Sequence, residues 1–166
     1  MNAIDWWAGR IRQVRLYVLG RVGHDERDEL RGWLSESQLA LFVSMHRADQ
    51  RHGLDVVAHL RAHGFDDREL LLAGLLHDCA KGPGVRLPHR VAWALGQRYG
   101  EGVVRLTMHL PSFGTAFDRL RDHADASATL ALAAGCSPRT VELIRHQDDP
   151  VDPVGGRALR LADEAC

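Results

Sequence analysis

Seven side chains that can bind a metal ion or a phosphate group recur along this chain. They are His52, the adjacent pair His77-Asp78, Lys81, His123, His146 and Asp163. Imidazole and carboxylate groups are ligands that divalent iron, manganese and zinc accept. Most of the seven fall at expected helix ends or on an apolar helix face, where an unpaired carboxylate is costly to bury. The pattern favours a shared metal centre over a set of separate histidine–carboxylate hydrogen bonds.

The first half of this set is built around the segment LLLAGLLHDCAKG, from Leu70 to Gly82. Its leucines predict a buried helix that presents His77 and Asp78 at its end. His52 comes 25 residues earlier and is expected to open the preceding helix. Lys81 follows His77 by four residues, so it shares nearly the same face if the helix continues. Its ammonium group can bind an anionic group as a point charge, or it can serve as a cation favoured by the helix dipole.

The second half repeats this arrangement. His123 is expected to open a helix, and His146 is expected to close the following one 23 residues later. Asp163 shares the apolar face of the last helix with Leu159 and Ala162. The cysteines at 79, 136 and 166 are odd in number and far apart, which argues against a disulfide framework.

The elements that must position these residues are all expected to be helices. Apolar residues recur at helical spacing, and no alternating strand pattern is present. Asp66 or Asp67 is expected to cap the leucine-rich helix, and Gly64 to end the one before it. The expected helices are Ile4–Leu19, Ser37–Met45, His52–His63, Asp67–Ala80, Pro88–Arg98, Gly102–Leu110, Asp122–Ala134, Pro138–His146 and Val154–Ala165. The predicted fold class is all-α, a bundle of short helices.

Three segments carry a resemblance to a known family. They are DQRHGLDVVAHL, AGLLHDCAKG and LRLADEA, which contain His52, then His77-Asp78, then Asp163. This order resembles the HD superfamily of metal-dependent phosphohydrolases. The segment HADASATLALAAGCSPRTVELIRHQDDP, with His123 and His146, looks like the second half of its two-metal branches. Those branches include the bacterial symmetrical diadenosine tetraphosphate hydrolases.

The resemblance implies an HD-domain helical bundle over residues 47–166, with a helical extension over residues 1–46. It implies that His52, His77, Asp78 and Asp163 hold one divalent metal ion, iron or manganese among the candidates. Asp78 would bridge to a second ion held by His123 and His146. Gln147 stands where many two-metal members have another histidine.

The reaction implied is hydrolysis of a phosphomonoester or phosphodiester, such as a nucleotide, by a metal-activated water, with Asp78 and Lys81 as catalytic residues. Two alternatives stay open. One is a di-iron oxygenase, because some HD proteins with six such ligands use oxygen. The other is a module that binds metal and nucleotide without turnover.

The composition of the chain limits the kinds of partner that it is expected to bind. The 166 residues carry 21 basic and 22 acidic side chains, so no strong positive field favours nucleic acid. No apolar run is long enough for a transmembrane segment. The absence of a secretory pattern and of a disulfide framework favours a cytoplasmic location. Arginines at 10, 12, 15 and 21 surround an apolar stripe, so the first helix either packs on the bundle or touches a membrane surface.

Overall fold

The computed structural model describes residues 20–82 and 84–166, and within these ranges the chain is all-α, as the sequence predicts. The helices are α2 (His24–Trp33), α3 (Glu36–Ser44), α4 (Arg47–Ala62), α5 (Arg68–Leu76), α6 (Leu87–Tyr99), α7 (Glu101–Thr107), α8 (Phe113–Arg121), α9 (His123–Ala133), α10 (Pro138–Arg145) and α11 (Gly155–Ala165). The expected helix from Ile4 to Leu19 lies outside the described residues. None of the described helices combines the length and apolar character that crossing a membrane requires.

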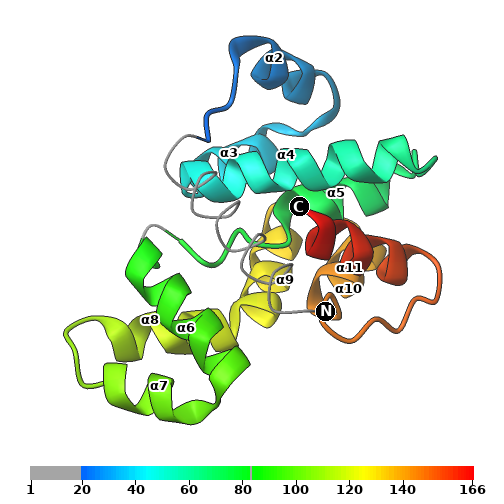
Figure 1. Ribbon diagram of the computed structural model, residues 1–166. Helices are drawn as coiled ribbons and strands as arrows, with labels where there is room; N and C mark the ends of the chain where they lie inside the picture. Colours follow the sequence, from blue (N-terminus) through cyan, green and yellow to red (C-terminus); the bar gives the residue numbers. More distant parts are fainter. Residues whose placement is uncertain (1–19, 83) are drawn as a thin grey trace.

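Helix α5 is the centre of the main body. Every residue from Leu70 to Leu76 is buried, as an apolar helix with no polar face requires. Its neighbours are α3, α4, α10 and α11, and Figure 1 shows it beneath α4 and close to α11. The Asp67 carboxylate caps α5 by accepting a hydrogen bond from Glu69 N, which confirms one of the two predicted caps. A rigid, buried helix therefore leads into the His77-Asp78 pair.

Helix α4 approaches α5 very closely because Gly53 has no side chain. A Cβ at Gly53 would lie 2.5 Å from Leu75 O, so an alanine there would force the two backbones apart. The helix begins at Arg47, with His46 as its N-cap. The prediction that His52 opens this helix is therefore wrong. His52 lies in the second turn, beside the glycine contact, and this position holds it close to the end of α5.

Helix α5 ends at Leu76, four residues before its predicted end at Ala80. Residues 77–81 form tight turns, in which Cys79 N donates to Leu76 O and Lys81 N donates to Asp78 O. Such bonds between residues i and i+3 wind the backbone more tightly than an α-helix does. The expectation that Lys81 shares an α-helical face with His77 is wrong for this reason.

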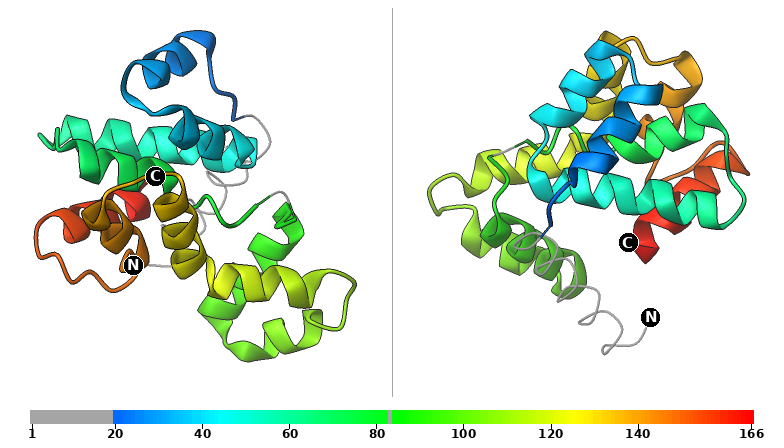
Figure 2. Two further views of the ribbon diagram at one scale, coloured as in Figure 1. Left: turned by 180° about the vertical axis from the view of Figure 1, so that it is seen from behind. Right: turned by 90° about the horizontal axis from the view of Figure 1, so that it is seen from above.

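Helices α6, α7 and α8 form a smaller unit, which we call the α6–α8 lobe. Figure 1 shows it at the lower left, away from α4 and α5, and the views in Figure 2 agree. It has its own apolar cluster, made of Val85, Ala92, Ala116, Phe117 and Leu120. The sequence predicts two helices in this segment. The structure has three, and α8 is the one that the sequence did not predict. Helix α2 was not predicted either.

A buried ion pair joins the α6–α8 lobe to α4. Arg90 of α6 donates through both guanidinium nitrogens to the two carboxylate oxygens of Asp49, at 2.7 Å each. The Asp49 side chain is almost completely buried, at 2% exposure. Asp49 lies one turn before His52, so the pair fixes the lobe close to the predicted ligands.

Replacing Arg90 with alanine should lower the free energy of unfolding by about 3 kcal/mol, because the Asp49 charge would stay buried without its partner. Urea denaturation measures this change. The control is Arg98→Ala, an exposed arginine of the same helix, which should stay within about 0.5 kcal/mol of wild type. Equal effects of the two substitutions would show that the Asp49–Arg90 pair does not fasten the lobe.

Candidate metal centre

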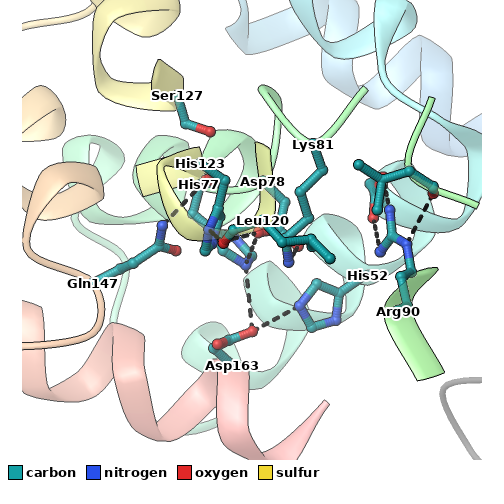
Figure 3. Close-up of polar contacts among 12 residues, drawn as sticks. His52, His77, Asp78, Lys81, Arg90, Leu120, His123, Ser127, Gln147 and Asp163 are labelled. Carbon is teal, nitrogen blue, oxygen red and sulfur yellow. Dashed lines mark hydrogen bonds and ion pairs between the residues drawn. The ribbon is translucent and has the colours of Figure 1, made fainter. Parts of the chain in front are cut away.

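Five of the six predicted ligands lie together where α4, α9 and α11 meet the turn after α5. Figure 3 shows these side chains pointing toward one another from four separate parts of the chain. They are His52 from α4, His77 and Asp78 from the turn, His123 from the first residue of α9, and Asp163 from α11. Their separation in the sequence means that only the folded bundle assembles this site.

His52, His77 and Asp163 form the tightest group, with one ligand atom from each lying within 4.8 Å of the others. Asp163 Oδ1 is 2.8 Å from His52 Nε2 and 3.3 Å from His77 Nε2. The two imidazole rings meet edge to face, with centroids 5.2 Å apart. Among the described residues, these three side chains form a group that can hold a metal ion.

Asp78 extends this group toward His123. Its Oδ1 lies 3.5 Å from His77 Nε2 and 3.6 Å from His123 Nε2. Its Oδ2 pairs with Lys81 Nζ at 2.5 Å. Among the described residues, the buried atoms Asp78 Oδ1 and His77 Nε2 have no hydrogen-bond partner. A carboxylate oxygen and an imidazole nitrogen thus face each other at the bottom of the site without bonding.

The hydrogen bonds made by the Nδ1 atoms of His77 and His123 explain why Asp78 Oδ1 and His77 Nε2 are not bonded. His77 Nδ1 lies 2.9 Å from Gly74 O, and His123 Nδ1 lies 2.8 Å from Leu120 O. A carbonyl oxygen only accepts, so each Nδ1 carries a proton, and the Nε2 of a neutral ring then presents a lone pair. When both rings are neutral, their Nε2 lone pairs lie 3.5 and 3.6 Å from Asp78 Oδ1, which is also electron-rich. A cation between them removes this repulsion, and histidines that ligate metals are commonly oriented by such carbonyl contacts.

In the absence of a metal ion, a proton can fill this role. Burial lowers the pKa of the His77 imidazole, but the Asp78 and Asp163 carboxylates outweigh burial and raise it to about 9. Burial acts to raise the pKa of Asp78, but Lys81 and the surrounding imidazoles hold it well below its usual range. The carboxylates are therefore ionised at neutral pH, and His77 retains a proton that a metal ion has to displace.

The spacing of the ligand atoms also suits a metal ion. Bonds of about 2.1 Å from a divalent ion to nitrogen or oxygen put neighbouring ligand atoms about 3.0 to 3.4 Å apart. The distances from His77 Nε2 to Asp163 Oδ1 and to Asp78 Oδ1, 3.3 and 3.5 Å, are close to this range. His52 is nearer to Asp163 because the two are hydrogen-bonded. The group of His52, His77 and Asp163 can therefore hold a metal ion.

The structure does not bring His146 to this group. Its Nε2 lies 3.3 Å from Glu142 Oε2, and it lines a different hollow, together with Arg139 and Pro150. The next residue, Gln147, is the one that points inward, where its amide donates to His77 O at 3.4 Å. Helix α10 ends at Arg145, and consecutive residues at such a helix end point in different directions. The spacing to His123 was therefore not enough to identify an inward-facing side chain.

Ser127 is a further residue of the site, one that the sequence did not reveal. It is fully buried in α9, and its hydroxyl accepts a hydrogen bond from Ala80 N at 3.0 Å. Together with Gln147 it holds the turn that carries His77 and Asp78. The only signal in the sequence was a small polar residue among alanines, which is also common on exposed helix faces.

Replacing Ser127 with alanine should lower the free energy of unfolding by about 1–3 kcal/mol, because Ala80 N would lose its buried partner. It should also weaken metal binding roughly tenfold, as loss of an orienting contact typically does. Urea denaturation and competition with a metal-chelating dye measure the two effects. Thr129→Ala is the matched control, since Thr129 is exposed in the same helix. Metal affinity unchanged by Ser127→Ala would show that the turn is positioned without it.

Comparison of the chain with protein-family models, with curated proteins and with solved structures finds no match.

Proposed function

We propose that the protein is a metal-dependent phosphohydrolase of the HD type, acting on a small phosphorylated substrate such as a nucleotide. One observation carries the proposal. Asp78 Oδ1 is buried and unbonded between the Nε2 atoms of His77 and His123, beside the group formed by His52 and Asp163. This arrangement of donors suits a divalent ion, and the order of the residues is the one that the HD resemblance implies.

The edge of the site is accessible to solvent, which a substrate needs. His77 and Asp78 form its floor, with 1% and 3% of their side chains exposed. Asp163, at the edge, is 42% exposed, and Lys81 is 18% exposed. A phosphoryl group can therefore approach from solvent while the ligands beneath it stay shielded from water.

In the proposed hydrolysis, the metal ion and the side chains of the protein have separate roles. His52, His77, Asp78 and Asp163 would hold a divalent ion, which would supply Lewis-acid activation of a water and of a phosphoryl oxygen. Lys81 offers a positive charge at the rim for a phosphoryl oxygen, and Asp78 holds the Lys81 ammonium in place. His123 presents an unprotonated Nε2 next to Asp78, because burial and the Lys81 charge lower its pKa. We propose one ion per chain, since His146 does not reach the site.

The test is metal analysis of the purified protein, followed by a phosphate-release screen over nucleotides, dinucleoside polyphosphates and cyclic dinucleotides. The screen uses protein loaded separately with iron, manganese and zinc. Phosphate release that depends on metal and is lost on chelation supports the proposal. Tight metal binding with no release from any compound would favour the binding module. Oxygen uptake on an organic substrate would favour the oxygenase.

A further inference from the structure

Arg119 of α8 places its guanidinium group against the chain that leaves the metal centre. Its Nη1 lies 2.6 Å from the point that a Cβ at Gly84 would occupy, and 3.7 Å from the corresponding point at Gly82. Gly82 directly follows Lys81, which is paired with Asp78. Leu120, next to Arg119, supplies the carbonyl that orients His123. The α6–α8 lobe thus brings a cation next to Gly82, the residue that follows Lys81.

The positive charge of Arg119 is not neutralised by a carboxylate in the described ranges. Its neighbour on the same helix, Arg121, pairs with Asp118 at 2.8 Å. Arg90 of the same lobe is bound to Asp49. The exposed Arg119 forms no such pair and faces backbone instead. An arginine in this state can bind an incoming anion without first breaking an ion pair.

The balance of charges at the metal centre leaves a further substrate phosphate without a cation, and Arg119 can supply one. Asp78 and Asp163 balance one divalent ion, and the ammonium of Lys81 already contacts Asp78. The phosphoryl group that reacts carries between one and two negative charges. A substrate with a further phosphate therefore needs another cation close by, and a planar guanidinium matches phosphate oxygens well.

We infer that Arg119 is a specificity-determining residue that binds a second anionic group of the substrate, next to the phosphoryl group at the metal centre. Its role in substrate choice rests on the proposed function. The selected substrates are those that carry two phosphate groups close together, rather than one isolated phosphate.

Gly84 offers a way to move the guanidinium without removing its charge. An alanine at position 84 would put its Cβ within 2.6 Å of Nη1, so the Arg119 side chain has to shift. Because this contact involves only the far end of a flexible side chain, the fold should tolerate the substitution. Gly84→Ala therefore tests the position of Arg119, and Arg119→Gln tests its charge.

The experiment measures binding of two non-hydrolysable probes, methylphosphonate and methylenediphosphonate, to the manganese-loaded protein by calorimetry. Metal content is measured after each titration, so that loss of the ion to the probe is detected. Wild type should bind methylenediphosphonate at least about tenfold more tightly. Arg119→Gln should remove most of this preference and leave methylphosphonate binding unchanged, and Gly84→Ala should reduce it. Arg121→Gln, the matched control on α8, should behave as wild type.

Two results would overturn the inference: no preference in wild type, or equal weakening of both probes by Arg119→Gln. The outcome is separable from that of the proposed function. Metal-dependent phosphate release without a preference between the probes would reject the role of Arg119 alone. A preference that depends on Arg119, in a protein that hydrolyses none of the screened compounds, would reject the hydrolase and keep the anion site.

Discussion

Asp78→Asn should sharply lower metal binding and phosphate release together. The carboxylate lies between His77 and His123 and also holds Lys81, so one substitution removes a negative charge from three contacts. We expect the metal content to fall from about one ion per chain toward zero. Activity should fall by roughly a thousandfold, the loss typical when a group that stabilises transition-state charge is removed. Elemental analysis and the phosphate-release assay measure the two quantities.

His146→Ala is the informative comparison, because the resemblance implies it as a ligand and the structure places it beside Glu142. We expect this variant to keep its metal and its turnover. A loss of half the metal from a wild type that carries two ions would show that His146 turns inward, and would restore the two-metal site. Asp78→Asn protein with full metal content would instead reject the centre described above.

Metal loading should stabilise the protein, and more strongly at high pH than at low pH. The pKa of His77 is about 9 in the folded metal-free chain, against an ordinary value of 6.5. A raised pKa stabilises the metal-free fold fully below pH 6.5, and this contribution is lost as the pH rises toward 9. A metal ion has to displace the same proton, so its binding strengthens over the same interval.

The expected size follows from ligand linkage. At a free metal concentration a thousandfold above the dissociation constant, binding adds about 4 kcal/mol to the free energy of unfolding. For a chain of this length that is a rise in melting temperature on the order of 10 °C. Thermal denaturation at pH 6, 7.5 and 9, with and without manganese, measures it. An increase that does not depend on pH between 6 and 9 would show that His77 does not exchange a proton for the ion.

The parts of the fold that the sequence predicted are those fixed by local signals. The leucine run identified α5, Asp67 identified its start, and Gly64, with a φ of +82°, identified the end of α4. His77 and Asp78 were located correctly at the end of a buried helix, because their position follows from the helix alone. Such features depend on a few consecutive residues, so they can be predicted from the sequence alone.

The features that sequence did not predict depend on contacts between distant elements. His146 and Gln147 are adjacent, and only the docking of α10 decides which of them faces His77. The short turn after Leu76 is held by Ser127 from another helix. Arg119 lies against Gly82 and Gly84 through the packing of the α6–α8 lobe, in a segment for which no motif was recognised. Helical periodicity carries no information on these tertiary contacts.

The distance along the chain between the ligands has a consequence for folding kinetics. His52 and Asp163 touch across 111 residues, so their contact exists only after α11 has packed onto α4. Because closing so long a loop costs chain entropy, we expect this contact to be weak or missing in the folding transition state. A contact of that kind acts chiefly on the unfolding rate. A bound ion should therefore leave refolding almost as fast as without metal and slow unfolding severalfold or more. The metal centre would then form after the bundle has packed, and it would act mainly by slowing unfolding.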